Sequence, residues 1–379
     1  MVGGGPGAFI GAVHRTAVRL DGLAEIVAGA FSSSAEKSKE TGTELHLDPN
    51  RVYGSWQELI EKEASRTTDR IDFISIVTPN FLHYPVAKAA LEAGFDVVCD
   101  KPMTMTVEES EDLCRTVTKT GRLFALTHNY TGYPMVKEAR KLVADGKLGE
   151  LRKIVVEYPQ GWLSTLLESD GQKQAVWRSD PEKAGISSAL GDIGTHCENL
   201  VHYITGLEMD TMLADLGTVV AGRALEDDAS ILIKYKGGAR GILYCSQISI
   251  GEENALTIRV YGSKAALEWK QENPNYLRMK YPDAPEQILK RGSGYLGAAA
   301  AHASRLPGGH PEAFIEAFAN IYTSAIRCMA ARAAGAAPTA LDNDYPTVQD
   351  GARGIHFIHT AVDSHKRQSW VDASYSPPK

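Results

Sequence analysis

The sequence predicts an α/β protein in two parts: a doubly wound parallel sheet at the N-terminal end, then an α/β domain with a large, open, mostly antiparallel sheet. In the first part, short apolar runs alternate with amphipathic helical patterns, which is typical of strands joined by covering helices. In the second part, alternating apolar and polar runs follow one another with no helix between them, as in antiparallel sheets. A length of 379 residues also favours two domains, and we place them at residues 1–130 and 131–379.

The chain opens with a glycine-rich segment that predicts the turn between a first strand and a first helix. Glycines are needed in such a turn when the backbone N–H groups at the helix N-terminus bind the pyrophosphate of a dinucleotide. The spacing departs from G-x-G-x-x-G, so a plain flexible terminus is the alternative. The candidate cofactor-binding residues of this segment are Gly3, Gly5, Phe9, Ile10 and Gly11.

Only Met1 and Val2 precede these glycines, although a doubly wound sheet places its first strand in the centre. We therefore expect either that the true start lies upstream of Met1 or that the chain is truncated.

The expected second strand ends in three serines, Ser32, Ser33 and Ser34, where dinucleotide-binding units usually carry an acidic residue for the ribose hydroxyls. A serine hydroxyl bonds either a 2′-hydroxyl or a 2′-phosphate, and the nearby Lys37 favours the phosphate. A serine N-cap for the helix beginning at Ala35 is compatible with both. We therefore leave the cofactor as NAD or NADP, with a slight preference for NAD, and name Ser32, Ser33 and Lys37 as cofactor candidates.

The rest of the first part follows the same alternation. Strands that are apolar throughout are covered by helices on both faces, and with the glycine-rich first turn this is the pattern of a Rossmann domain. The strands are expected at residues 26–30, 71–77, 95–99 and 123–127, and the helices at 56–64, 84–93 and 107–118.

The second part is expected to form a sheet from strands in series and then to close with two helices that pack back on the first domain. A segment rich in Gly, Ala and Ser, residues 292–310, predicts a long surface loop between them. The strands are expected at 212–220, 230–235, 239–248, 257–261 and 265–270, and the helices at 312–334 and 348–364.

Composition excludes several classes of protein. Hydrophobic residues at 43% and charged residues at 23% are ordinary for a folded domain, and a net charge of −7 without a dense basic run argues against a nucleic-acid partner. The five cysteines never form a C-x-x-C pair, which argues against a disulfide framework and against a metal site. With no apolar stretch long enough to span a bilayer and no signal-peptide pattern, we expect a cytoplasmic protein with no membrane partner.

Three short motifs lie in order along the chain: T-P-N-F-L-H at residues 78–83, D-K-P at 100–102 and G-D-I-G-T-H at 191–196. Together they resemble the T-P-N-x-x-H, E-K-P and G-D-x-G-x-H segments of the glucose-fructose oxidoreductase, inositol dehydrogenase and MocA (Gfo/Idh/MocA) family. Order and spacing agree over nearly the whole chain. Asp100 stands where the family more often has Glu, and this keeps the carboxylate.

The resemblance implies a nicotinamide cofactor in the N-terminal domain and a sugar or polyol substrate at the domain interface, against the open sheet. It implies a catalytic group of Lys101, Asp192 and His196, which also contact the substrate, and a Lys-Pro bond that is often cis. The cofactor-binding residues that it adds are Thr78, Pro79, Asn80, His83, Asp100 and Lys101.

The residues themselves support this chemistry. Lys101 follows the carboxyl end of a strand, where ligands of open α/β sheets bind. Asp192 and His196 are four residues apart and share one helix face if Gly191 opens a helix. Oxidising an alcohol needs a base that accepts the hydroxyl proton, and we assign this role to His196. Lys101 would share or relay the proton, and Asp192 would orient the substrate. A solvated lysine, a structural histidine and an aspartate N-cap are the alternatives.

Four further residues are candidates for substrate contacts: Tyr130, Trp177, Arg178 and His310. For each, packing or capping is the alternative. His356 and His359 lie one turn apart on a late helix, but no third ligand is evident, so we interpret them as structural.

The predicted function is hydride transfer between NAD(P) and a secondary hydroxyl or ketone of a sugar, cyclic polyol or glycoside. Two alternatives are a regulator that senses dinucleotide and sugar without turnover, and an enzyme that cleaves glycosides with the help of bound NAD. An open sheet with an apolar face also predicts a homodimer or homotetramer.

Overall fold

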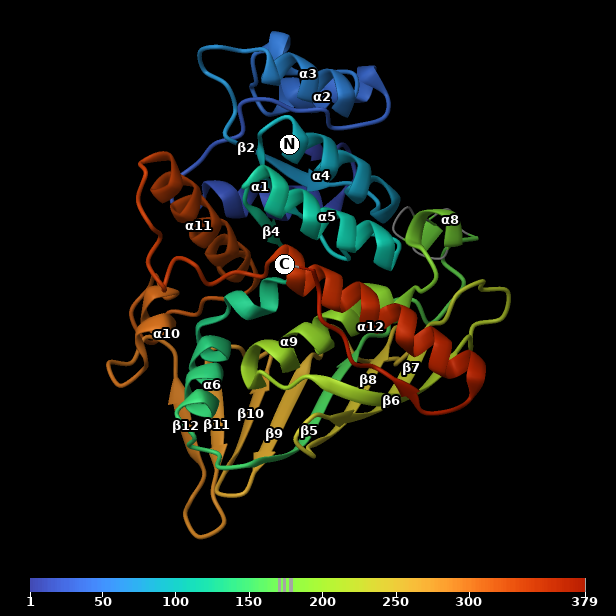
Figure 1. Ribbon diagram of the computed structural model, residues 1–379, viewed down its shortest axis with the longest axis vertical. Helices are drawn as coiled ribbons and strands as arrows, with labels where there is room; N and C mark the ends of the chain where they lie inside the picture. The colour runs from blue at the N-terminus through green and yellow to red at the C-terminus, as the bar shows by residue number, and fades with distance from the viewer. Residues whose placement is uncertain (170–171, 173–174, 177–179, 379) are drawn as a thin grey trace.

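The computed structural model describes residues 1–169, 172, 175–176 and 180–378, which form two sheets at opposite ends of the molecule (Figure 1). The first sheet has four strands in the order β1-β2-β3-β4, and the second has nine in the order β12-β11-β10-β9-β5-β8-β7-β6-β13, counted over the described residues. The predicted fold class, a Rossmann-type parallel sheet followed by an α/β domain with a large antiparallel sheet, is confirmed.

The strands of the first sheet pair in parallel, and their side chains are enclosed by helices. Ile74, Ile76, Val97 and Cys99 are fully buried, as expected for strands covered on both faces. The elements of this part are β1 (Val2–Gly3), α1 (Phe9–Arg19), α2 (Ala35–Glu44), α3 (Trp56–Ala64), β2 (Phe73–Val77), α4 (His83–Glu92), β3 (Asp96–Cys99), α5 (Val107–Thr120) and β4 (Phe124–Leu126).

The expected strand at residues 26–30 differs from the prediction. It is an extended segment joined to its neighbours only by single parallel bridges, Val2 to Ala30 and Gly29 to Val52. The reason is that β1, its partner, is only two residues long, so there is little backbone to pair with.

The second sheet is antiparallel except for the parallel pair β5–β8. Four of its strands were not expected from the sequence. One of them, β12, is largely exposed, so its sequence carries no alternation of apolar and polar residues. The strands are β5 (Leu151–Pro159), β6 (Met209–Gly217), β7 (Asp228–Tyr235), β8 (Arg240–Ser246), β9 (Thr257–Gly262), β10 (Ala266–Lys270), β11 (Tyr276–Lys280), β12 (Gln287–Lys290) and β13 (Val371–Asp372).

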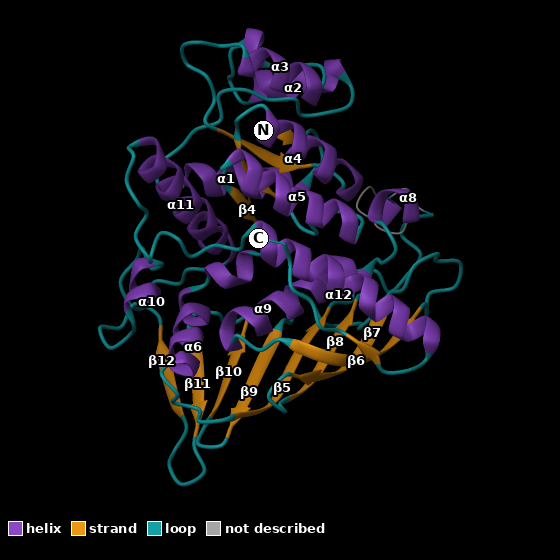
Figure 2. Ribbon diagram, viewed as in Figure 1, coloured by secondary structure: helices purple, strands orange, loops and turns teal. Residues whose placement is uncertain are grey.

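Helices lie on one face of this sheet, between it and the first sheet (Figure 2). Two of them, α11 and α12, return the chain to the first part, where α11 packs on α1 and α12 packs on α5. The backbone N–H of Leu126 at the end of β4 donates to the carbonyl of Pro346 at 2.8 Å. The helices are α6 (Pro134–Ala144), α8 (Pro181–Ala184), α9 (Thr195–Thr205), α10 (Ala298–His302), α11 (Phe314–Ala333) and α12 (Val348–Arg367).

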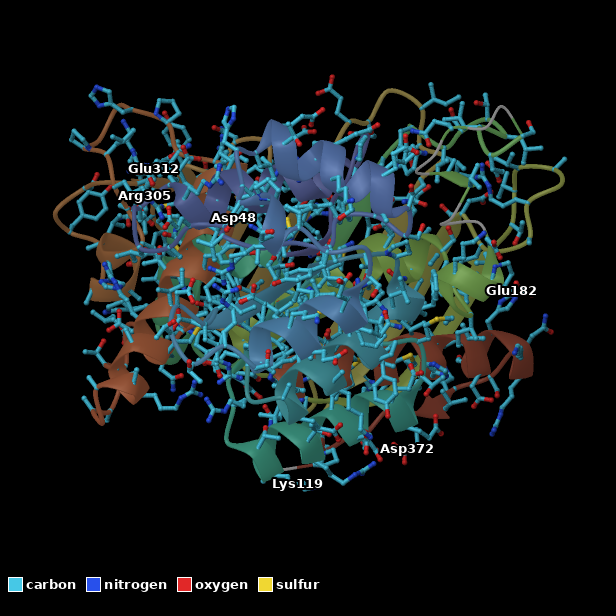
Figure 3. All side chains as sticks on the ribbon, turned by 90° about the horizontal axis from the view of Figure 1, so that it is seen from above. Asp48, Lys119, Glu182, Arg305, Glu312 and Asp372 are labelled. Atoms are coloured by element: carbon cyan, nitrogen blue, oxygen red, sulfur yellow. The ribbon has the colours of Figure 1, made fainter. Side chains whose placement is uncertain are left out.

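The segment expected to be a long surface loop, residues 292–310, contains the short helix α10 and is held at its ends by ion pairs. A buried pair joins Arg291 to Glu312 at 2.7 Å, and the backbone N–H of Arg305 donates to Glu312 at 2.8 Å. Figure 3 shows Arg305 and Glu312 side by side. The Arg305 side chain also pairs with Asp21, just after α1. This segment therefore ties the edge of the second sheet to the first part.

Among the described residues, no helix combines the length and the apolar character needed to cross a bilayer.

Candidate active site

A large cavity lies between the two sheets and has walls from both parts of the chain. Its volume is about 1300 Å³, above the range of about 300–1,000 Å³ that is usual for one small ligand, and this fits an extended cofactor together with a substrate. Residues that follow β1, β2 and β3 form one wall, at the carboxyl edge of the parallel sheet where such folds bind ligands. Residues of the second part form the opposite wall.

The glycine-rich turn, which we call the glycine cradle, lies close to the backbone of two other segments. Gly3 has a φ of +85°, and a Cβ there would lie 2.7 Å from the carbonyl oxygen of Val77. A Cβ at Gly5 would lie 2.6 Å from the carbonyl oxygen of Phe31. Both glycines line the cavity, and the absence of a side chain at each lets the turn lie against the backbone of Val77 and Phe31.

Gly11 serves a different purpose from Gly3 and Gly5, because it does not line the cavity. A Cβ at Gly11 would lie 2.4 Å from the Cα of Gly4, so glycine here lets α1 approach the turn. Gly4 itself has a φ of +77° and lines the cavity, although the sequence analysis did not single it out. Its carbonyl accepts a hydrogen bond from Arg15 at 2.6 Å.

Apart from Gly11, the predicted residues at the start of α1 line the cavity, and so do the predicted residues that follow the extended segment 26–30. Ala8, the residue before α1, makes no side-chain capping bond to the first turn of the helix. Ser34 caps α2 by accepting from the N–H of Lys37 at 3.4 Å, as the capping alternative required. The predicted residues that line this end of the cavity are Phe9, Ile10, Ser32, Ser33 and Lys37.

Sequence reasoning missed a neighbouring group, Ser55, Trp56 and Gln57, which lines the same cavity. Ser55 caps α3, and this capping pattern was visible in the sequence but carried no sign of a ligand.

The T-P-N segment lines the cavity through Thr78, Pro79 and Asn80, but His83 does not. The two ring nitrogens of His83 lie 2.8 Å from the carbonyl oxygens of Thr78 and Pro102. Burial lowers the pKa of His83. This side chain therefore ties the T-P-N turn to the Lys-Pro turn instead of facing the cavity.

Lys101 stands at a turn that is fixed by its neighbours. The peptide bond to Pro102 is cis. The Asp100 carboxylate, which lines the cavity, accepts the N–H of Lys101 and the hydroxyl of Thr127, both at 2.9 Å. The Lys101 ammonium then reaches across to the second part and donates to the Asp192 carboxylate at 2.8 Å and to the Asp192 carbonyl. Both side chains are mostly buried.

Asp192 lies in a π-helical turn, Leu190–Gly194, that runs directly into α9. It does not cap the helix, because its carboxylate binds Lys101 and accepts from the Gln247 amide at 2.9 Å. The buried Glu226 carboxylate holds the start of the turn by accepting from the hydroxyl of Ser187 and from the N–H groups of Ser188 and Leu190. Neither Gln247 nor Glu226 was singled out in the sequence.

His196 lies one turn after Asp192 and also lines the cavity. Its ring packs edge-on against Tyr130 at 4.6 Å and against His128 at 5.4 Å between centroids. Among the described residues, its Nδ1 is enclosed and has no hydrogen-bond partner. Burial, followed by the charges of Lys101 and His128, lowers the pKa of His196 well below its usual value. The imidazole is therefore neutral, and the same shift makes it a weaker base than a free imidazole.

The remaining predicted residues fall into three groups. Tyr130 lines the cavity. His310 is exposed on the segment that holds α10, where its backbone N–H donates to the carbonyl of Pro307 at 3.4 Å and its carbonyl accepts from Arg291. Trp177 and Arg178 lie outside the described residues.

His356 stacks on Tyr375 at 4.3 Å, and His359 contacts the carbonyl of Met105, which fits their interpretation as structural. No group of residues that could hold a metal ion occurs in the described part of the chain.

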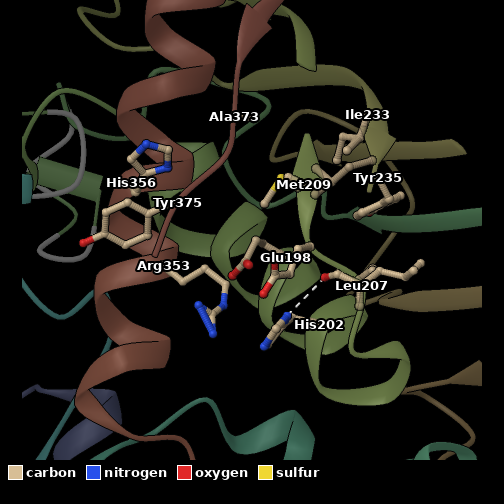
Figure 4. A pocket seen from close by; sticks show the side chains of 13 residues that line it. Glu198, His202, Leu207, Met209, Ile233, Tyr235, Arg353, His356, Ala373 and Tyr375 are labelled. Atoms are coloured by element: carbon tan, nitrogen blue, oxygen red, sulfur yellow. Dashed lines mark hydrogen bonds between the residues drawn. The ribbon is translucent and has the colours of Figure 1, made fainter. Parts of the chain in front are cut away.

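A second, much smaller cavity is lined by residues of α9, α12 and the second sheet (Figure 4). Glu198 on α9 and Arg353 on α12 line it, and the Glu198 Oε2 and Arg353 Nε atoms are enclosed without a hydrogen-bond partner among the described residues. Burial raises the pKa of Glu198 to about 8.

Comparison with known proteins gives relatives that match both parts of the chain. The model of the oxidoreductase family with an NAD-binding Rossmann fold matches residues 1–128, and that of the GFO/IDH/MocA C-terminal domain matches residues 136–268. An uncharacterised oxidoreductase of Bacillus subtilis strain 168 is 35% identical over 383 residues, covering 98% of this chain and 95% of the relative.

Two solved structures are similar over almost the whole chain. An inositol dehydrogenase homologue from Azotobacter vinelandii, complexed with NAD⁺, has a TM-score of 0.93 and 38% identity, covering 98% of this chain and 96% of that chain. The structure of an inositol dehydrogenase homologue from the same organism with NADH and myo-inositol has a TM-score of 0.91 and 37% identity, with the same coverage of both chains. The resemblance drawn from the three motifs is confirmed: the chain belongs to the GFO/IDH/MocA family of oxidoreductases, with an NAD-binding Rossmann fold.

Proposed function

We propose that the protein is an NAD(P)-dependent dehydrogenase that oxidises a secondary hydroxyl of a sugar, cyclic polyol or glycoside, or reduces the corresponding ketone. The observation that carries this proposal is the contact between the two parts of the chain, where the Lys101 ammonium meets the Asp192 carboxylate beside a neutral His196. These groups line a cavity that the glycine cradle also lines. The inositol dehydrogenase homologues among the similar structures support a polyol as substrate.

NAD(P), when bound, supplies the acceptor for the hydride that leaves the substrate carbon. The side chains of the protein accept the hydroxyl proton and bind the substrate oxygen. With a proton on the enclosed Nδ1, His196 presents Nε2 to accept the hydroxyl proton. The Lys101 ammonium donates to the same oxygen and stabilises the negative charge that develops there. Asp192 keeps Lys101 in place and accepts a neighbouring substrate hydroxyl.

We propose NAD as the slightly preferred cofactor, with NADP as the alternative. The similar structure with NAD⁺ bound supports NAD. Ser32, Ser33 and Lys37 at the cavity wall are compatible with a ribose hydroxyl and with a 2′-phosphate.

The test is reduced-nicotinamide absorbance with NAD or NADP and a panel of inositols, aldoses and glycosides. Wild-type protein is expected to turn over at least one of them, and Lys101→Met is expected to lose about 10²–10⁴-fold in rate because the charge at the reacting oxygen is gone. The cofactor should still raise the melting temperature of the variant. Lys88→Met is the matched control, since Lys88 forms an ion pair of similar length, 2.7 Å, with Asp112 away from the cavity.

Equal rates in Lys101→Met and wild type would contradict the proposal. Cofactor binding without turnover of any substrate would favour the regulatory alternative. Release of a leaving group without net NADH would favour glycoside cleavage assisted by bound NAD.

A further inference from the structure

The cavity wall next to His196 is formed by a group of neutral side chains from segments that are far apart in the sequence. We call Tyr130, Tyr158, Gln160, Trp162 and Asn254 the amide–phenol panel. Tyr158 ends β5, Gln160 and Trp162 follow it, and Asn254 lies between β8 and β9. All five line the cavity, and only Tyr130 was singled out in the sequence.

The hydrogen bonds of the panel form a closed ring with a fixed direction. The Tyr158 hydroxyl donates to Asn254 Oδ1 at 2.6 Å, and Asn254 Nδ2 donates to the Tyr130 hydroxyl at 3.3 Å. A phenol has one proton, and that of Tyr158 is already used, so Tyr130 must be the donor in the short bond between the two hydroxyls. Bonds in such a ring polarise one another, which holds the Asn254 amide in one orientation.

Gln160 and Trp162 extend the ring along the cavity wall. The Gln160 Nε2 donates to Asn254 Oδ1 at 2.7 Å, and the Trp162 indole donates to Gln160 Oε1 at 3.0 Å. In each carboxamide, the oxygen therefore accepts a hydrogen bond within the panel, and one N–H of the NH₂ group donates one. The second N–H of each is left to donate to a ligand oxygen.

The backbone beneath the panel is rigid. The N–H of Gly161 donates to Glu252 at 2.9 Å, and a Cβ at Gly161 would lie 2.7 Å from the carbonyl oxygen of Ser249. The N–H of Asn254 donates to the Glu272 carboxylate at 2.8 Å. The panel is thus positioned before any ligand binds, and little entropy is lost when it does.

An independent observation points to a ligand at the same wall. Gln271 and Asn129 also line the cavity, and Gln271 Oε1 and Asn129 Nδ2 are enclosed without a hydrogen-bond partner among the described residues. A buried polar atom left unpaired costs about 1–3 kcal/mol. One orphan atom is an acceptor and the other a donor, and hydroxyl groups satisfy both.

We propose that Asn254 is the specificity-determining residue of this site, and that its outward N–H donates to a hydroxyl oxygen of an uncharged, polyhydroxylated ring. The inference rests on the proposed dehydrogenase function and adds the substrate group that is recognised away from the reacting carbon. Asn254 affects substrate binding and not the chemical step, because the reacting oxygen is bound by Lys101 and His196.

The test compares Asn254→Ala with Asn273→Ala, in which an exposed asparagine outside this cavity is changed in the same way. Steady-state kinetics are measured on the best polyol from the panel of substrates and on its monodeoxy analogues. Asn254→Ala is expected to raise KM about 10- to 100-fold with a smaller change in kcat, as for a lost hydrogen bond to a substrate hydroxyl. Asn273→Ala is expected to behave as wild type.

The deoxy analogues identify the partner of Asn254. For one analogue, the KM of the wild-type enzyme should rise by about the same factor as it does for the full polyol in Asn254→Ala. The KM of Asn254→Ala should not rise further with that analogue. A KM in Asn254→Ala within twofold of wild type, or a full additional loss with every deoxy analogue, would overturn the inference. If Asn254→Ala does not fold, as judged by its melting temperature, Tyr158→Phe removes only the hydroxyl that directs the ring and should raise KM in the same sense. Absence of turnover in wild type is a separate outcome that overturns the dehydrogenase function itself, and this inference with it.

Discussion

At the residue scale, Gly11 is the tightest position in the glycine-rich turn, because the atoms around it belong to backbone. We expect Gly11→Ala to lower the free energy of unfolding by about 1–3 kcal/mol and to weaken cofactor binding, since α1 must move away from Gly4. Denaturant unfolding and cofactor-induced thermal shift measure the two effects. Gly294→Ala is the control, because a Cβ there meets no atom within 4 Å and its φ needs no glycine. Equal losses in both variants would contradict the packing argument.

Glu198 gives a pH-dependent prediction at the same scale. Its pKa is raised from 4.5 to about 8 by burial, while Arg353 lowers it and Asp350 raises it. Between pH 4.5 and about pH 8, this carboxyl is ionised in the unfolded chain but protonated in the folded protein. The free energy of unfolding therefore falls as the pH rises through this range.

Glu198→Gln should therefore have the same free energy of unfolding as wild type below about pH 4.5 and a larger one than wild type towards pH 8. The difference should reach a few kcal/mol, since one pKa unit corresponds to about 1.4 kcal/mol. Melting temperatures from pH 4 to pH 9 measure this, with Glu25→Gln at an exposed position as the control. A difference that shrinks as the pH rises would contradict the assignment.

At the element scale, the π-helical turn Leu190–Gly194 decides where Asp192 points, and Glu226 holds that turn. Glu226→Ala leaves three donors without a partner, those of Ser187, Ser188 and Leu190. We expect a loss of about 2–4 kcal/mol in stability and a fall in kcat, because the contact of Asp192 with Lys101 loosens. Glu226→Gln keeps the accepting oxygen and should retain more of both. Full activity in Glu226→Ala would show that the turn is held by other contacts.

The elements themselves were predictable to different degrees. The buried strands β2 and β3 have continuous apolar sequences, and the periodicity of α5 is plain, so the sequence predicted them. β12 has little buried surface, and its place in the sheet depends on pairing with β11. The spacing of Asp192 and His196 predicted a shared helix face, but a π-turn has no signature in the amino-acid pattern.

At the scale of the whole molecule, helices cover one face of the sheet, which has nine strands among the described residues. On the opposite face, apolar side chains such as Leu232 and Ile242 are exposed. These two residues are direct partners across β7 and β8. We propose that this face joins subunits into a homodimer or homotetramer. Leu232→Glu is expected to reduce the molar mass measured by light scattering after gel filtration. Ile250→Glu, at an exposed turn, is the control, and an unchanged mass in Leu232→Glu would contradict this interface.

The division at residues 1–130 and 131–379 stays a proposal. The packing of α11 on α1 and of α12 on α5 means that the last helices serve both parts. Expression of residues 1–130 alone would test how far the first part depends on these helices: the fragment is expected to aggregate or melt early, since Phe318 and Tyr322 of α11 form a shared cluster with Val13 and Ala17 of α1. A stable, cofactor-binding fragment would contradict this.

The sequence by itself determined the fold class and the family, because buried periodicity and short motifs are local properties of a chain. It also predicted Lys101, Asp192 and His196 as the catalytic group, and this stays a prediction. Only the tertiary structure decided that Lys101 meets Asp192 across 91 residues, that Gly11 and His83 serve packing and that His310 does not line the cavity. It alone revealed the ring around Asn254. Such contacts follow from how distant segments pack and satisfy one another's hydrogen bonds, and the local pattern of residues does not encode which partners will meet.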